Sequence, residues 1–140
     1  MSRTSFRSTV CLLVLGVAIG ARGARAQPAA PAAAAAKTVK NPVTATPASV
    51  AAGQATFGKY CKFCHGADAK GNGPLAPKDT HPPDLTDATW TNGATDGAIF
   101  ASIRAGIGPT FDMKANPATK IPDPDVWNVV NYLRSVGPRK

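Results

Sequence analysis

The sequence predicts an all-α domain, because apolar residues recur at helical spacing in three segments and the connections between them are rich in Gly and Pro. No segment shows the sustained apolar/polar alternation that is typical of a strand. Gly and Pro supply 13 residues each out of 140, and 44% of the residues are hydrophobic. This composition suits one small folded domain with long loops rather than a low-complexity chain.

Residues 1–26 have the three parts of a secretory signal peptide. Arg3 and Arg7 give a charged start, an apolar run covers residues 10–19, and Ala-Arg-Ala at 24–26 is a cleavage signal with small outer residues. The apolar run is too short for a membrane anchor, since a helical span needs about 20 apolar residues. We therefore expect a cleaved leader and a mature protein in the periplasm, without a stable membrane span.

Loss of the leader changes the charge and the cysteine count. Four arginines leave without an acidic residue, so the formal charge falls from +8 to +4, and Cys11 leaves as well, so two of the three cysteines remain. The rest of the chain has no basic stretch interleaved with aromatic residues, so nucleic-acid binding is not expected.

Residues 27–47 are rich in Ala, Pro and Thr and lack an apolar helical face. This composition predicts a linker or a disordered arm. The folded domain is then expected over residues 48–140, where no internal repeat is visible.

The first predicted helix covers residues 49–60. Val50, Gly53, Phe57 and Tyr60 follow one another at helical spacing, and the two cysteines after them continue the same face. The helix therefore leads directly into the most informative segment of the sequence.

Residues 61–65 have the pattern C-x-x-C-H, which is typical of covalent haem attachment. Cys61 and Cys64 can each add to a porphyrin vinyl group, and His65 then places an imidazole under the iron. A disulfide, a thioredoxin-like dithiol and a zinc site that includes His81 are the alternatives. The dithiol needs strands that are not predicted, and zinc needs ligation by the adjacent Cys64 and His65. Haem c is favoured because the pattern follows an export signal and uses every mature cysteine.

Two further helices are predicted after this motif. One covers residues 97–105, with Thr95 or Asp96 as its cap and Gly106 as its end. The last begins with Asp123 at the N-cap and Pro124 in the first turn, and it stops at Gly137. Their apolar stripes are Ile99, Phe100 and Ile103 in the first, and Val126, Val129, Val130 and Leu133 in the second.

From about residue 48 onward the chain resembles a small class I cytochrome c. The similarity extends beyond the C-x-x-C-H pattern to Gly53-x-x-x-Phe57, to Gly-Pro-Leu at 73–75 and to a C-terminal helix over 127–134. The resemblance implies three main helices around one haem, with the last helix crossing the first through Val129 and Tyr132 near Gly53 and Phe57.

The resemblance also implies roles for two loop residues. The carbonyl of Pro74 would accept a hydrogen bond from Nδ1–H of His65, as partners of metal-bound histidines commonly do; the turn after residues 71–73 explains Pro74 equally well. Met113, the only methionine left after Met1, would be the sixth iron ligand, with His81 as the rival. Lys114 stands where many members of this family have proline.

These ligands imply electron transfer rather than catalysis. With His65 and Met113 on the two axial positions, no position remains for a substrate, and a thioether ligand favours ferrous iron. We expect an electron carrier between redox proteins, without catalytic residues, that is a monomer or part of a complex. The alternatives are a cytochrome subunit of a dehydrogenase or oxidase, and a haem sensor or peroxidase if Met113 is not a ligand.

Charge is segregated along the domain. Residues 59–78 carry a net +3, whereas residues 79–103 carry a net −4. Lysines beside the motif are predicted either to steer the haem edge towards an acidic partner or to form an ordinary solvated face. Aromatic residues make up only 6% of the chain, so the haem is expected to complete a modest core.

Overall fold

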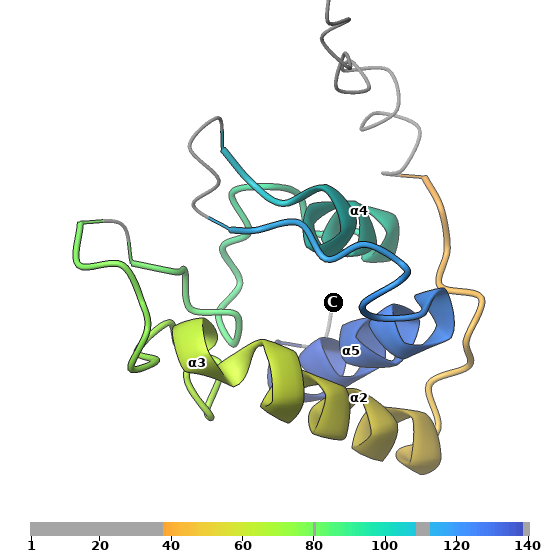
Figure 1. The fold of residues 1–140 in the computed structure, drawn as a ribbon. Coiled ribbons are helices and arrows are strands. Elements are labelled where there is room, and N and C mark those ends of the chain that lie inside the picture. The colour runs from red at the N-terminus through yellow and green to blue at the C-terminus, as the bar shows by residue number, and fades with distance from the viewer. Residues whose placement is uncertain (1–37, 80, 109–112, 139–140) are drawn as a thin grey trace, which may run out of the picture.

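The computed structural model describes residues 38–79, 81–108 and 113–138. The predicted signal peptide and the first part of the predicted arm lie outside these residues. Within the described ranges the regular elements are helices (Figure 1), and none of them is long and apolar enough to cross a membrane. The all-α prediction is confirmed. The helices are α2 (Pro47–Tyr60), α3 (Lys62–His65), α4 (Asp96–Ala105) and α5 (Asp123–Val136).

Helices α2 and α5 pack directly against each other, and Gly53 sets how closely they approach. A Cβ atom at Gly53 would lie 1.9 Å from the carbonyl oxygen of Asn128 and 2.9 Å from Cβ of Tyr132. One turn further along, the rings of Phe57 and Tyr132 have centroids 5.3 Å apart. The crossing agrees with the one that the family resemblance implies, and the backbone that meets Gly53 is that of Asn128.

Helix α5 supplies half of the buried hydrophobic residues of the described chain. Its predicted apolar stripe is buried, and the N–H of Gly137 closes its last turn on the carbonyl of Leu133. The predicted N-cap is wrong: Pro122 occupies that position, and Asp123 is the first helical residue. The carboxylate of Asp123 pairs instead with Arg104 of α4, so it is not available to cap its own helix.

Helix α2 begins earlier than predicted because Thr46 caps it. Its Oγ1 accepts a hydrogen bond from N–H of Ser49, 3.1 Å away, and Pro47 fills the first helical position. Both are ordinary signals of a helix start.

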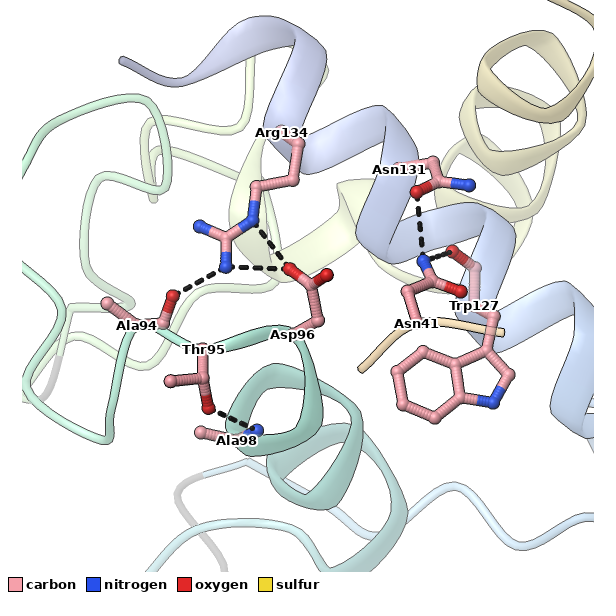
Figure 2. A network of polar contacts seen from close by, with 8 residues as sticks. All are labelled: Asn41, Ala94, Thr95, Asp96, Ala98, Trp127, Asn131 and Arg134. Carbon is pink, nitrogen blue, oxygen red and sulfur yellow. Dashed lines mark hydrogen bonds and ion pairs between the residues drawn. The ribbon is translucent and has the colours of Figure 1, made fainter. Parts of the chain in front are cut away.

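Ordered contacts with the domain begin before the predicted boundary at residue 48. The amide nitrogen of Asn41 donates to the carbonyl of Trp127, at 3.0 Å, and to Oδ1 of Asn131, at 2.9 Å (Figure 2). Asn131 in turn donates to the carbonyl of Val43, at 3.0 Å, and Val43 packs against the core. Residues 41–43 are therefore hydrogen-bonded to α5, and the orange segment in Figure 1 passes one end of that helix before it enters α2.

Helix α4 is held at both ends. Thr95 caps it by accepting from N–H of Ala98, at 3.2 Å, and Gly106 ends it with φ +75°. Arg134 of α5 donates to Asp96, at 2.8 Å, and to the carbonyl of Ala94, at 2.5 Å (Figure 2). Both helix bounds agree with the prediction to within one residue.

Candidate functional site

The motif cysteines lie where α2 passes into the single turn of α3. Cys61 ends α2 and precedes α3, and its carbonyl accepts from N–H of Cys64, at 3.2 Å, and of His65, at 3.0 Å. Both cysteines are free and partly buried, so the disulfide alternative is not formed. The turn presents two thiols and one imidazole from five consecutive residues.

Burial sets the protonation states of two of these groups. It raises the pKa of Cys61 to about 11, although the nearby Lys120 ammonium acts in the opposite direction. At neutral pH the unattached thiol of Cys61 is therefore protonated. Burial also lowers the pKa of His65, which leaves a neutral imidazole with a lone pair for a metal.

The imidazole of His65 lies in an apolar setting. Its ring centroid is 6.3 Å from that of Phe57. Its Nδ1 is buried and has no hydrogen-bond partner among the described residues, so the predicted bond to the carbonyl of Pro74 is not formed. A buried polar atom without a partner is unusual in a finished core, so Nδ1 still lacks the acceptor that the carbonyl of Pro74 is predicted to supply.

The turn that contains Pro74 is nevertheless fixed beside His65. N–H of Gly71 donates to the carbonyl of His65 at 2.8 Å, and N–H of Gly73 donates to that of Cys64 at 3.1 Å. N–H of Leu75 reaches the carbonyl of Phe63 at 2.7 Å. Three backbone bonds thus hold residues 71–75 against α3, which keeps Pro74 as a predicted acceptor.

Met113 lies on the segment between α4 and α5, far along the chain from the attachment turn. It forms an isolated antiparallel bridge with Ile107, with N···O distances of 2.9 and 3.3 Å. Its half-buried side chain packs against the core. His81, the rival ligand, is exposed.

No zinc site is assembled in the part of the chain that the structure describes. Nowhere in it do three His, Cys, Asp or Glu side chains come together as a metal cluster. The C-x-x-C-H turn therefore has no third and fourth zinc ligand of these types within the described ranges.

Lys120 is a neighbour of the motif that the sequence did not reveal. Its ammonium lies close enough to Cys61 to affect that thiol, and it is 5.6 Å from the ring centroid of Tyr60. Lys59 lies 5.0 Å from the centroid of the same ring, and Lys62 lies 5.4 Å from that of Phe63. The basic patch of the molecule is defined by Lys59, Tyr60, Lys62, Phe63 and Lys120. No local pattern indicates Lys120, because it is far from Cys61 along the chain.

Comparison with protein families matches residues 48–133 to the family described as cytochrome c oxidase, cbb3-type, subunit III. The matched region contains both motif cysteines, His65 and Met113, and covers more than half of the chain. The chain belongs to this family. It is a c-type cytochrome domain, and its cofactor is one haem c attached through Cys61 and Cys64.

Curated relatives of this cytochrome are subunits of cbb3-type oxidases. FixP of Sinorhizobium medicae is 31% identical over 88 residues, which is 61% of this chain and 27% of the relative. CcoP of Rubrivivax gelatinosus is 36% identical over 85 residues, 60% of this chain and 25% of the relative. The chain therefore spans only about a quarter of the length of these relatives.

Solved structures show the same fold. Cytochrome cL of Methylophaga aminisulfidivorans has a TM-score of 0.51 and 26% identity, over 66% of this cytochrome and 58% of that chain. A chain of the reducing HAO-like complex of Kuenenia stuttgartiensis has a TM-score of 0.60 at 21% identity, over 71% of this cytochrome and 50% of that chain, a likeness of fold alone.

The described residues fit the cofactor. The thiols of Cys61 and Cys64 are free, and the buried imidazole of His65, whose pKa is lowered by burial, has a lone pair for a metal. When bound, a haem c supplies an iron that exchanges one electron between its ferrous and ferric states. The polypeptide fixes the attachment turn by backbone hydrogen bonds and places the ring of Phe57 near His65.

Proposed function

We propose that this cytochrome is an exported electron carrier whose haem iron is ligated by His65 and Met113. The proposal rests on Met113, which is the only methionine of the mature chain. Its backbone N–H and carbonyl both form hydrogen bonds with Ile107, and its side chain packs against the core. A cofactor held between two protein ligands has no vacant position for a substrate, so it transfers electrons without bond chemistry.

The residues of the chain favour a comparatively high reduction potential. A thioether sulfur is a soft ligand that stabilises ferrous iron, and apolar neighbours disfavour the extra charge of the ferric state. Phe57 lies against His65, and Met113 packs against a core that is mostly aliphatic. The donor and acceptor are therefore redox proteins near the oxidising end of an electron-transfer chain.

The basic patch supports docking to an acidic redox partner. Next to the attachment turn, Lys59 and Lys120 lie near the ring of Tyr60, and Lys62 lies near that of Phe63. Phe63 is 44% exposed, so its ring is available for contact. Complementary charge raises the encounter rate, and the effect weakens as salt screens it.

A second candidate is an electron-transfer subunit of an oxidase complex. It is favoured by the curated relatives, which are named as cbb3-type oxidase subunits. Tagged full-length chain, purified under mild conditions from the organism that makes it, separates the two: a free carrier elutes alone, whereas a subunit elutes with oxidase polypeptides.

Carbon monoxide binding to the reduced, haem-loaded protein tests whether both axial positions of the iron are filled. The wild type is expected to keep its spectrum under carbon monoxide, because both axial positions are filled. Met113→Ala should open one position and shift the spectrum on addition of the gas. A carbon monoxide complex in the wild type would contradict the carrier and favour a sensor or peroxidase.

A further inference from the structure

Arg104 joins the end of α4 to the segment that contains Met113. Its Nη1 donates to the backbone carbonyls of Asn116, at 2.8 Å, and of Ile121, at 2.6 Å, and its Nη2 pairs with the carboxylate of Asp123. The side chain is only 16% exposed. A planar guanidinium can hold several acceptors at fixed angles, which makes the contact a rigid clamp.

The clamp acts on the residues that follow Met113. N–H of Asn116 donates to the carbonyl of Ile103, at 3.0 Å, and its side-chain amide donates to the carbonyl of Lys114, at 3.1 Å. Arg104 follows Ile103 in α4, so one turn of that helix binds Asn116 at both its N–H and its carbonyl. The backbone at Asn116, three residues beyond Met113, is therefore held at both its N–H and its carbonyl.

The backbone of Met113 itself also lies close to the end of α4. A Cβ atom at Gly106 would lie 2.4 Å from the carbonyl oxygen of Met113, and Gly106 has φ +75°. Met113 itself lies outside regular helices, and its only regular pairing among the described residues is the bridge with Ile107. Its position therefore depends on these few contacts rather than on a helix of its own.

We propose that Arg104 is a positioning residue for the Met113 sulfur, and that it determines how easily an external ligand replaces this sulfur on the iron. The proposal rests on ligation by Met113, as proposed above. A ligand that takes the position of the sulfur must displace the segment, so its apparent affinity contains the free energy of that displacement. Loosening the clamp lowers this free energy and raises the affinity.

Imidazole is the probe, and the ferric haem-loaded protein is titrated with it. Arg104→Lys keeps the charge, but its single ammonium cannot hold two carbonyls and a carboxylate in a fork. Loss of at least one hydrogen bond to a charged group should tighten imidazole binding roughly tenfold. Asn116→Ala removes the side-chain amide that donates to the carbonyl of Lys114. It should loosen the same segment and tighten imidazole binding as well.

Arg134→Lys is the matched control. Arg134 also binds one carboxylate and one backbone carbonyl, but at the opposite end of α4, at Asp96 and Ala94. This variant should lower the thermal midpoint and leave the dissociation constant of imidazole unchanged. Equal tightening in Arg134→Lys and Arg104→Lys, or a wild-type constant in Arg104→Lys, would overturn the positioning role.

Met113→Ala separates this proposal from the proposed function. If Met113→Ala binds imidazole far more tightly than the wild type while Arg104→Lys does not, only the role of Arg104 fails. If Met113→Ala binds imidazole like the wild type, Met113 is not the ligand and both proposals fail.

Discussion

Gly53 shows how one hydrogen atom in place of a methyl group decides the packing of two helices. The carbonyl of Asn128 occupies the space that a side chain would need, and a backbone group cannot rotate away as a flexible side chain can. Gly58 lies in the same helix and has no atom within 4 Å of a Cβ position. The fold therefore excludes a side chain at Gly53 and has room for one at Gly58, although both are interior residues of α2.

Gly53→Ala should destabilise the haem-loaded protein by about 3 kcal/mol, because the added methyl forces α2 and α5 apart. Gly58→Ala, the matched control, should stabilise it by about 0.5–1 kcal/mol through helix propensity alone. Guanidinium unfolding followed by far-UV circular dichroism measures both changes. A Gly53→Ala protein as stable as the wild type would contradict the described crossing.

At the scale of elements, a polar network fixes the segment before α2 onto α5. Asn131 is 5% exposed; its amide donates to the carbonyl of Val43 and to Oγ of Ser49, and its carbonyl accepts from Asn41. Ser49 also donates to Oδ1 of Asn128, at 2.7 Å. Each buried polar atom of Asn131 is satisfied, so the network adds specificity as well as stability.

Asn131→Ala should cost about 2–3 kcal/mol of unfolding free energy, because it leaves buried partners without hydrogen bonds. Ser135→Ala, on the exposed part of the same helix, should change stability by less than about 0.5 kcal/mol. Thermal unfolding of the three proteins compares them. The network has no energetic role if Asn131→Ala and Ser135→Ala have the same midpoint as the wild type.

At the scale of the whole molecule, we expect the cofactor to be part of the core. Half of the buried hydrophobic residues lie on α5, and among the described residues only α2, α4 and α5 are longer than one turn. A small domain buries a limited share of its surface, so one large apolar group adds much to its stability. Covalent attachment also restricts the unfolded chain.

The haem-free polypeptide should therefore be largely unfolded. Its far-UV circular dichroism is expected to lack the helical minima of the haem-loaded protein, and its amide protons should exchange rapidly. Native-like helical dichroism in a haem-free preparation would show that the polypeptide supplies a sufficient core by itself.

Local chemistry made part of this molecule predictable. The C-x-x-C-H turn and the apolar stripe of α5 depend on neighbouring residues, so the pattern alone was sufficient. Thr46 followed by Pro47 is also a local helix-start signal and could have been found from the sequence. The clamp of Arg104 and the position of Lys120 join residues far apart in the chain, so they became visible only in the fold.

The ligation of the iron by Met113 is tested most directly by the weak far-red absorption band of the ferric haem-loaded protein, which reports a methionine sulfur on the iron. The wild type and His81→Ala are expected to show the band, and Met113→Ala is expected to lack it. Absence of the band in the wild type, or its survival in Met113→Ala, would contradict His65/Met113 ligation and the closed electron-transfer site built on it.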